Sequence, residues 1–382
     1  MNEAQCSGSE KRIVFITGTR ADYGKLKSII EKVNNTSGFE GHIFVTGMHM
    51  LRKYGYTMNE IEKGNYRNVH TFINQNHSDT MDSILGKTIS GLSDYVKEIK
   101  PDMIVIHGDR VESMAGSIVG SLNNILVSHI EGGEVSGTID DVLRHATTKL
   151  SHLHFVSNDH AKKRLRQLGE NKNHIHVIGS PDVDIIQDGS LPEIGEVKSY
   201  YNIVFEHYAI FLFHSVTTEV NELKEHVKGF VDAMISSNEN YIGIFPNNDN
   251  GNDLIIAEYE RLKSNSRFLV FPSIRFEFFL TLLKNAKFII GNSSCALMEA
   301  PYFGVPAIDI GSRQSNRAKL KNVVNVEPNR ERIEETIFKI QEYRQAPIQP
   351  YGAGNSALRF LDVIKDSRTW EMSRQKVFQD RH

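Results

Sequence analysis

The sequence predicts an α/β protein made of two Rossmann-like halves that face each other across a central cleft. Short apolar runs alternate with segments of helical periodicity in the first half, which is typical of a doubly wound parallel sheet. A more polar stretch at 189–207 interrupts this rhythm, and the same alternation then restarts. At 382 residues the chain is also long for one hydrophobic core, so two domains are expected.

The expected strands follow in chain order. In the first half they are residues 12–17, 42–46, 69–73, 103–106, 125–130, 153–157 and 176–180, with a long helix at 79–99. In the second half they are 209–214, 241–246, 267–272, 288–292 and 306–311, and a last helical stretch is expected around 355–378. We therefore assign residues 1–188 to a first domain and 189–365 to a second, with 189–207 as the linker.

Composition excludes several classes of partner. The chain is 40% hydrophobic and 24% charged with a formal net charge of −3, so nothing in its charge favours nucleic acid or an anionic membrane. No apolar run approaches the roughly 20 residues that span a bilayer, and the polar leader at 1–11 lacks the apolar core of a signal peptide. Cys6 and Cys295 fit no metal-ligand spacing, which suggests a reducing compartment. We expect a cytoplasmic protein.

The first strand is followed by the turn at 18–25, Gly-Thr-Arg-Ala-Asp-Tyr-Gly-Lys. It lacks the G-x-G-x-x-G fingerprint, which disfavours a nicotinamide or flavin cofactor, and it lacks a Walker A ending. A helix start with free N–H groups binds anions, and Arg20 would add a phosphate clamp. A capped helix with a solvent-exposed arginine is the alternative.

Ionisable residues gather after two central strands, as His-Gly-Asp-Arg at 107–110 and His-Ile-Glu-Gly-Gly-Glu at 129–134. The carboxyl ends of parallel strands are where open α/β sheets place ligand chemistry. Asp109 could instead cap the helix that follows it. Glu131 stands beside paired glycines that let a ligand approach closely, and burial could raise its pKa toward the range useful for proton transfer.

The segment at 138–145 adds Asp140, Asp141, Arg144 and His145. On a helix this spacing pairs 140 with 144 and 141 with 145, so a surface salt-bridge ladder is the alternative to a functional cluster. The acids form no D-x-D motif and the histidines lack the H-E-x-x-H spacing. No metal site is therefore expected.

The second half offers a nucleotide-diphosphate site. The sequence Gly-Asn-Ser-Ser at 291–294 opens a helix with small hydroxyl residues and free amides, which suits a diphosphate. Glu299 could accept hydrogen bonds from ribose hydroxyls, and Arg313 is another arginine at a strand end. His214 ends a strand, where a lone histidine is more often structural, and the segment at 246–249 has the composition of a plain turn.

Taken in this order, the clusters resemble the hydrolysing UDP-N-acetylglucosamine 2-epimerases over nearly the whole chain. The matching segments are GTRADYGKL (18–26), VTGMHM (45–50), HGDR (107–110), HIEGGEVSGTIDD (129–141), RH (144–145), FPNND (245–249), GNSS (291–294) and GSRQSNR (311–317). The HIEGGE and SGT-x-DD forms resemble the sialic-acid-pathway branch. The two-domain pattern resembles the GT-B fold, which implies that a C-terminal helix, about 366–382, crosses back onto the first domain.

The resemblance implies that UDP-N-acetylglucosamine and water become N-acetylmannosamine and UDP, by elimination to 2-acetamidoglucal and hydration, with no metal or redox cofactor. A related branch acts on UDP-2,4-diacetamido-2,4,6-trideoxyglucose for legionaminic acid, and the motifs do not separate the two substrates. A GT-B glycosyltransferase and a UDP-sugar sensor are weaker alternatives. Relatives form homodimers or homotetramers, so a homo-oligomer is expected.

The resemblance also implies residue roles. Asp109, Glu131 and Asp140 match the catalytic acids, and which of them takes the C2 proton is left open. His214 joins the catalytic set and, with Arg20, matches a position that holds the diphosphate. The remaining residues expected to bind UDP or substrate are Lys25, Arg110, Arg144, Asn247, Ser293, Ser294, Glu299 and Arg313.

Overall fold

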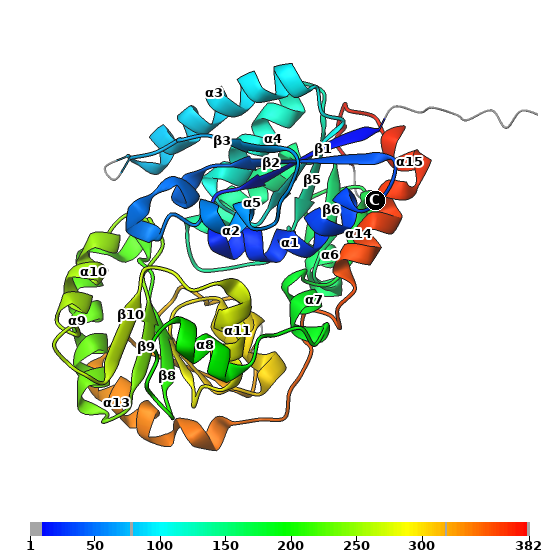
Figure 1. Cartoon of the computed structure of the whole chain (residues 1–382). Coiled ribbons are helices and arrows are strands. Elements are labelled where there is room, and N and C mark those ends of the chain that lie inside the picture. The colour runs from blue at the N-terminus through cyan, green and yellow to red at the C-terminus, as the bar shows by residue number, and fades with distance from the viewer. Residues whose placement is uncertain (1–9, 77–78, 318, 380–382) are drawn as a thin grey trace, which may run out of the picture.

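A computed structural model describes residues 10–76, 79–317 and 319–379; the leader that carries Cys6 lies outside this range. The described chain forms two parallel sheets, one from each half, which lie one above the other in Figure 1. The predicted fold class of two Rossmann-like halves is confirmed. No helix in the described part of the chain is long and apolar enough to cross a membrane.

The first sheet has the strand order β3-β2-β1-β4-β5-β6-β7. Its strands are β1 (Lys11–Thr17), β2 (Phe39–Val45), β3 (Val69–Thr71), β4 (Met103–His107), β5 (Leu126–Ile130), β6 (Leu153–Val156) and β7 (Ile175–Val177). The helices are α1 (Arg20–Asn34), α2 (Met58–Glu62), α3 (Met81–Ile99), α4 (Val111–Leu122), α5 (Ile139–Leu150), α6 (Asp159–Gln167) and α7 (Asp182–Gln187). Each expected strand of the first half is found.

Helices cover both faces of this sheet, which is why its central strands read as continuous apolar runs. Along β1, Ile13 and Phe15 pack in the core shared with α1, whereas Val14 and Ile16 pack in the core shared with α3 and α4. Successive side chains of a strand point to opposite faces, so two separate cores need an apolar residue at every position.

The second sheet repeats this order as β10-β9-β8-β11-β12-β13. Its strands are β8 (Ala209–Leu212), β9 (Tyr241–Ile244), β10 (Phe268–Phe271), β11 (Ile289–Gly291), β12 (Ala307–Ile310) and β13 (Val323–Val326). Its helices are α8 (Ile194–Tyr200), α9 (Val220–Ser236), α10 (Asn252–Glu260), α11 (Phe276–Lys284), α12 (Cys295–Met298) and α13 (Arg330–Lys339). The edge strand β13 was not predicted. It has only four residues, one of them asparagine and none of them fully buried, so it does not form the apolar run typical of a buried strand.

The expected linker at 189–207 is not a free connection. Its helix α8 packs against α11, and Val197, Ile203 and Phe205 are buried in the core of the second half. These three apolar residues attach the segment to the core of the second half. They are too few and too irregularly spaced to produce a helical or strand periodicity in the sequence.

The C-terminal segment crosses back to the first half, as Figure 1 shows for the chain beyond α13. The expected position of this helix, about 366–382, is wrong: α14 (Ser356–Lys365) packs on α1, α15 (Ser367–Trp370) follows, and residues 371–379 contain no helix. The helix starts early because Asp184 accepts hydrogen bonds from the backbone N–H groups of Ser356 (2.7 Å) and Ala357 (2.8 Å). A carboxylate distant in sequence thus caps α14.

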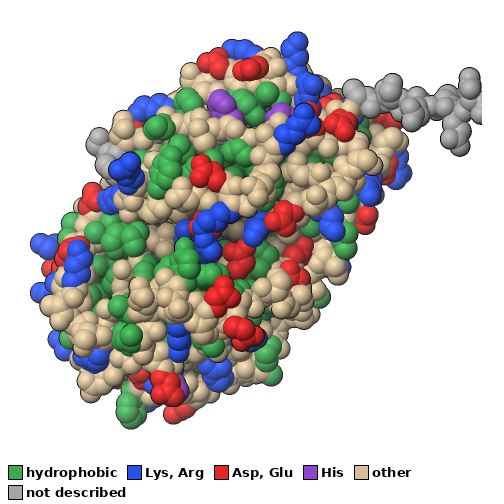
Figure 2. Space-filling view, in the orientation of Figure 1, with side chains coloured by type: hydrophobic (Ala, Val, Ile, Leu, Met, Phe, Trp, Pro, Cys, Tyr) green, Lys and Arg blue, Asp and Glu red, His purple; other side chains and the backbone are tan. Residues whose placement is uncertain are grey.

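Charged side chains gather where the two halves meet (Figure 2). Lys27 of α1 forms an ion pair with Glu277 of α11 at 2.5 Å, and Arg275 pairs with Glu60 of α2 at 2.9 Å. These pairs tie helices of one half to helices of the other. The described structure therefore holds the two halves in contact.

Candidate active site

The predicted site residues lie at the two switch points of the sheets. In the first sheet the strand order reverses between β1 and β4, and in the second between β8 and β11. Loops at the carboxyl ends of these strands form the crevice in which doubly wound folds bind ligands. The loops after all four strands line two adjoining cavities, of about 140 Å³ and 230 Å³.

The two cavities form one continuous cleft, because both are lined by Thr19, Ala21, Lys25, Asn247, Ser294 and Arg313. The smaller cavity also contains Asp109, Arg110, Glu131, Asp140 and Arg144. The larger also contains Arg20, His214, Ser293 and Glu299. Every site residue predicted from the sequence therefore reaches this cleft.

Glu131 is a buried carboxylate with two basic partners. Its Oε2 lies 3.2 Å from Lys25 Nζ and 2.8 Å from His107 Nε2. Burial alone would raise the pKa of Glu131, but the charges of Lys25 and His107 outweigh it and hold that pKa well below its usual range. The net shift in the pKa of Glu131 is therefore downward, opposite to the rise expected from burial. Its φ of +68° is also unusual for a non-glycine residue, as expected for a side chain held in place by its surroundings.

Asp109 pairs with a buried arginine. Its Oδ2 accepts a hydrogen bond from Nη2 of Arg144. The other two nitrogens of this guanidinium, Nε and Nη1, are buried and have no hydrogen-bond partner. The N-cap of α4 is Arg110 without a side-chain capping bond, so Asp109 does not cap this helix. This excludes the alternative in which Asp109 caps α4. Asp109 instead lines the smaller cavity.

Asp140 and Asp141 have different partners from those that helical spacing suggested. Asp140 Oδ2 lies 3.4 Å from Arg313 Nη2 of the second half. Asp141 Oδ1 accepts hydrogen bonds from the backbone N–H (2.7 Å) and the hydroxyl (3.1 Å) of Ser136. Neither an Asp140–Arg144 nor an Asp141–His145 ion pair is present among the described residues, so the salt-bridge ladder is not formed.

The loop that carries Glu131 is bonded to the loop after β12. Gly137 donates its N–H to the Arg313 carbonyl (3.0 Å), Asn316 Nδ2 donates to the carbonyl of Ser136 (3.2 Å), and Arg317 Nε donates to that of Val135 (2.9 Å). Arg317 Nη1 is buried without a partner, and Arg317 lines the smaller cavity. Contact between the halves thus adds a second-half guanidinium to the acids of the first half.

Arg110 bridges the halves through neutral and charged partners. Its Nε lies 3.1 Å from Glu112 Oε2, and its Nη2 donates to Asn248 Oδ1 of the second half at 2.9 Å. Burial would lower the pKa of Arg110, but Glu112 and other nearby acids raise it above its ordinary value. Arg110 is therefore positively charged, and its guanidinium already has partners in both halves of the protein.

Arg20 begins α1, where Thr19 and Asp22 form a capping box. Its Nε and Nη1 are buried and have no hydrogen-bond partner. Burial lowers the pKa of Arg20, while Tyr201 and Glu60 act against that shift. The capped helix is present, but Arg20 is not the solvent-exposed arginine of that alternative: it lines the larger cavity.

His214 is a neutral hydrogen-bond donor toward the larger cavity. Its Nδ1 accepts the backbone N–H of Asn247 at 3.1 Å, so the ring proton is on Nε2. Burial, helped by the charges of Arg313 and Arg110, lowers the pKa of His214 well below its usual value. Asn292 exchanges hydrogen bonds with the backbone of His214 at 2.7 and 2.8 Å, which fixes the end of β8.

Ser293 and Ser294 precede α12, which has only four residues. Such a short helix has a small dipole, so recognition of an anion here depends on the hydroxyls and N–H groups themselves. Glu299 follows α12, and Asp182 of the first half is a nearby acid. Burial and the charge of Asp182 raise the pKa of Glu299 to about 8.

Sequence reasoning missed Asp182, Asp249 and Arg317. Arg317 was part of a matched motif, but nothing in the sequence showed that its side chain enters the cleft. Asp249 belongs to a segment read as a plain turn, yet it lines the smaller cavity, and burial raises its pKa. Asp182 follows the strand β7 and carries no motif, so only the fold brings it to Glu299.

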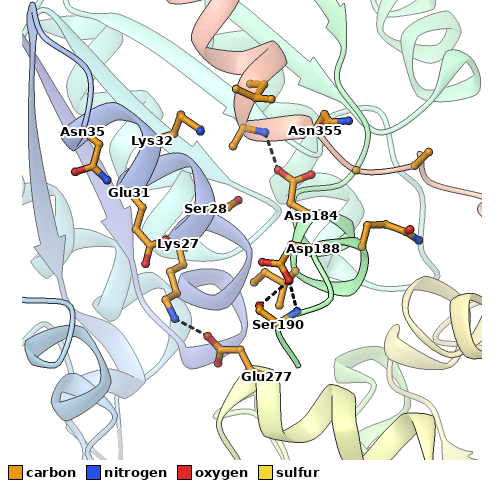
Figure 3. Close-up of a pocket in the computed structure, with 16 residues that line it drawn as sticks. Lys27, Ser28, Glu31, Lys32, Asn35, Asp184, Asp188, Ser190, Glu277 and Asn355 are labelled. Atoms are coloured by element: carbon orange, nitrogen blue, oxygen red, sulfur yellow. Dashed lines mark hydrogen bonds and ion pairs between the residues drawn. The ribbon is translucent and has the colours of Figure 1, made fainter. Parts of the chain in front are cut away.

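Among the described residues, no group of three or more histidines, cysteines or acids could hold a metal ion. A further pocket of about 650 Å³ lies outside the cleft, between α1, α7, α11 and the start of α14 (Figure 3). Three of its charged side chains are already engaged: Lys27 contacts Glu277, and Asp184 caps α14. None of the predicted site residues lines it.

Comparison with known proteins gives the family. Residues 31–365 match the sequence profile described as UDP-N-acetylglucosamine 2-epimerase. A Neisseria meningitidis serogroup B protein named UDP-N-acetylglucosamine 2-epimerase is 46% identical over 97% of this chain and 99% of its own length. A Legionella pneumophila protein named UDP-N,N'-diacetylbacillosamine 2-epimerase (hydrolyzing) is 30% identical over 93% of this chain and 96% of its own length.

Solved structures share the fold. A Methanocaldococcus jannaschii UDP-GlcNAc 2-epimerase in complex with UDP-GlcNAc and UDP superposes with a TM-score of 0.79 at 22% identity, covering 93% of this chain and 99% of that one. A Neisseria meningitidis UDP-GlcNAc 2-epimerase bound to UDP-GlcNAc gives 0.78 at 17% identity, with the same coverage. The two-domain GT-B-like architecture is therefore shared, and the sequence matches show that the chain belongs to the UDP-N-acetylglucosamine 2-epimerase family.

Proposed function

We propose that this protein is a hydrolysing 2-epimerase that converts UDP-N-acetylglucosamine and water into N-acetylmannosamine and UDP, and so feeds sialic acid synthesis. The observation that carries the proposal is the meeting of Asp109, Glu131 and Asp140 in one small cavity, continuous with a larger one lined by Arg20 and His214. The first cavity offers acid–base groups and the second offers groups that bind a diphosphate.

The reaction divides naturally between the two cavities. A base takes the C2 proton, the C2–H electrons form the C1–C2 double bond, and the C1–O bond breaks to release UDP. Water then adds across the C1–C2 double bond. Its hydroxyl group goes to C1, and C2 receives a proton on the face opposite to the one that lost it. Arg20, Arg313 and the Nε2–H of His214 are donors suited to the negative charge that develops on the leaving diphosphate.

The three carboxylates differ in their fitness as the base. Glu131 is the least suited, because Lys25 and His107 hold its pKa low and so lower its affinity for a proton. Asp109 and Asp140 each face one arginine, and their side chains are 24% and 23% exposed. We assign the C2 proton to one of these two aspartates, and to Glu131 the task of directing water or stabilising positive charge at C1.

Relatives support the hydrolysing assignment. The Legionella protein carries that word in its name, and a 30% identical Escherichia coli relative is named polysialic acid biosynthesis protein P7. Names of relatives also favour a second substrate, since that Legionella protein acts on UDP-N,N'-diacetylbacillosamine by its name. The higher identity to the Neisseria protein, 46% against 30%, favours UDP-N-acetylglucosamine.

The test is incubation with UDP-N-acetylglucosamine in D2O, followed by NMR. Free N-acetylmannosamine with deuterium at C2 is the expected product. UDP-N-acetylmannosamine without free sugar would identify a non-hydrolysing enzyme, and a glycoside formed only with an acceptor would identify a glycosyltransferase. The diacetamido-trideoxy sugar nucleotide, run in parallel at equal concentration, decides the substrate by the ratio of kcat/KM values.

A further inference from the structure

Gln314 has a buried side-chain amide of which only one end is hydrogen-bonded. The residue follows Arg313 in the loop after β12, lines the smaller cavity and is 4% exposed. Its Nε2 donates a hydrogen bond to the carbonyl of Asn292 at 2.8 Å. Among the described residues that line this cavity, Gln314 contributes the one side-chain oxygen, Oε1, that is buried without a hydrogen-bond partner.

The orientation of this amide is fixed by its neighbours. A carbonyl only accepts hydrogen bonds, so the NH2 group of Gln314 must face Asn292 and the oxygen must point away from it. Asn292 is itself held, because its side chain exchanges hydrogen bonds with the backbone of His214 at 2.7 and 2.8 Å. Gln314 Oε1 is therefore an acceptor whose direction is set by the protein.

This oxygen lies between the loop expected to hold the diphosphate and the candidate acids. Asn292 belongs to the Gly-Asn-Ser-Ser loop, and Arg313, next to Gln314, contacts Asp140 at 3.4 Å. Gln314 and Asp140 line the same cavity of about 140 Å³. In a UDP-sugar the diphosphate is attached to C1 and the reacting C2 is its neighbour. A sugar held between this loop and these acids therefore brings its C2 substituent to this wall.

The other free groups of the cavity leave an acceptor role to Gln314. Arg144 Nε and Nη1 and Arg317 Nη1 are buried donors without partners in the same cavity. They suit the hydroxyl and carbonyl oxygens of a sugar. An amide N–H only donates, so it needs an acceptor such as Gln314 Oε1.

A neutral acceptor also suits the chemistry at C2. Removal of the C2 proton places negative charge beside the C2 substituent, and a carboxylate bonded to that substituent would repel the charge. The amide oxygen of Gln314 carries no net charge. The aspartates of the cavity already face cations, Asp109 with Arg144 and Asp140 with Arg313.

We propose that Gln314 is a specificity-determining residue whose Oε1 accepts a hydrogen bond from the N–H of the substrate's 2-acetamido group. This inference rests on the proposed function, because it takes a UDP-2-acetamido sugar as the ligand. Both candidate substrates carry this group, so the inference does not depend on the choice between them. A sugar nucleotide without this N–H leaves Oε1 unpaired in an enclosed site, which weakens its binding.

The test compares two unreactive sugar nucleotides by calorimetry. In both, a CH2 group replaces the oxygen between C1 and the diphosphate, so UDP cannot leave. One carries a 2-acetamido group, and the other a 2-acetoxy group with an ester oxygen in place of the N–H. The wild type is expected to bind the acetamido compound about 10- to 100-fold more tightly. Gln314→Met, which has a similar length but only a weak acceptor, should reduce this preference to about threefold or less.

Controls separate recognition from order of the loop. A change that only disturbs the loop weakens both compounds equally and leaves their ratio unchanged. UDP has no sugar, so its Kd with Gln314→Met should stay within about threefold of the wild-type value. Ser315→Ala, at an exposed position of the same loop, is the matched control and should keep the wild-type preference.

A second variant covers the case in which Gln314→Met does not fold. Gln314→Lys keeps a donor for Asn292 but has no acceptor, so it should lose the preference as well. A preference that is equal in the wild type and these variants, or a wild-type preference below about threefold, overturns the inference. A wild type that shows the preference but releases no N-acetylmannosamine overturns the proposed function alone. A wild type that binds neither compound overturns both.

Discussion

Arg313, beyond β12 of the second half, places its Nη2 3.4 Å from the Oδ2 of Asp140 in the first turn of α5. The same guanidinium donates from Nη1 to the carbonyl of Asn292 at 3.3 Å, at the start of the Gly-Asn-Ser-Ser loop. One side chain thus contacts a candidate catalytic acid and the loop expected to hold the diphosphate. A bound diphosphate would compete with Asp140 for Arg313, which links departure of the leaving group to the charge of the acid.

Replacement of Arg313 by alanine is expected to weaken both binding and turnover. Loss of a charge-assisted contact to the diphosphate should raise the Kd for UDP roughly ten- to hundredfold, and kcat should fall as well because Asp140 loses its partner. Calorimetry and steady-state kinetics measure the two effects. A variant with normal UDP affinity would show that Arg313 serves only to join the halves.

Replacement of the candidate acids separates catalysis from binding. Asp109→Asn, Asp140→Asn and Glu131→Gln should each lower kcat by about 10²–10⁴-fold, the range for a positioned acid–base group. UDP affinity should change little in Asp109→Asn and Glu131→Gln, and it should not weaken in Asp140→Asn, which releases Arg313 for the diphosphate. Asp94→Asn, an exposed acid on α3, is the control. Near-normal rates in the three variants would show that these acids are structural.

The same variants distinguish the base from the residue that directs water. The variant without the base should form neither 2-acetamidoglucal nor product, because the C2 proton stays in place. Glu131→Gln should instead release 2-acetamidoglucal, which NMR detects directly. Absence of the glycal with Glu131→Gln, together with its release by both aspartate variants, would reverse the assignment made above.

Arg317 is expected to matter for turnover more than for nucleotide binding. Its Nε bond to Val135 orders the loop that carries Glu131, and its Nη1 is free to meet the sugar. Arg317→Gln should lower kcat by roughly tenfold or more, consistent with loss of a hydrogen bond to a charged group, while the Kd of UDP stays within twofold. Asn316→Gly removes the neighbouring loop contact and is the control, because Asn316 has a φ of +59° that glycine adopts without strain. Equal losses of kcat in both variants would show that Arg317 acts only by ordering the loop that carries Glu131.

His214 is expected to stay neutral throughout the working pH range. Because burial and two nearby arginines lower its pKa, the ring should not gain a proton between pH 5 and 8. Two-dimensional ¹H–¹⁵N NMR of the histidine rings should show an Nε2–H tautomer with constant shifts. A titration in this range, or a proton on Nδ1, would contradict the hydrogen bond from Asn247.

Glu170 is expected to stabilise the attachment of the C-terminal segment. Its buried carboxylate contacts Lys149 (2.7 Å), His154 (2.9 Å) and Lys376 (2.6 Å). Burial opposes ionisation, but His154 and the lysines lower the pKa of Glu170 to about 2. A lowered pKa gives stability that is complete above the unfolded value and is lost as pH falls toward 2.

Glu170→Gln should therefore reduce the free energy of unfolding at pH 7 by roughly 3 kcal/mol, as when one partner of a buried ion pair is removed. Its stability should also fall less steeply than that of the wild type between pH 4.5 and 2. Urea unfolding at several pH values measures both effects. Equal slopes for the two proteins would mean that Glu170 does not carry this acid sensitivity.

The sequence by itself determined the architecture and the location of the site. Strands buried on two faces need an apolar residue at nearly every position, so runs such as 103–106 were recognisable, and ligand residues in a doubly wound sheet follow the ends of such strands. This is why Asp109, Glu131 and the Gly-Asn-Ser-Ser loop were found. The short edge strand β13 and the helix α8 were missed because neither is long enough to show a period.

Only the tertiary structure decided how the charges pair. Spacing along a helix suggested Asp140 with Arg144, whereas the fold pairs Asp140 with Arg313 and Arg144 with Asp109. It also reversed the expected pKa shift of Glu131 and brought Asp182 to Glu299. A pKa depends on every charge within a few ångströms, and in this protein those neighbours lie in loops of both halves that are distant in sequence.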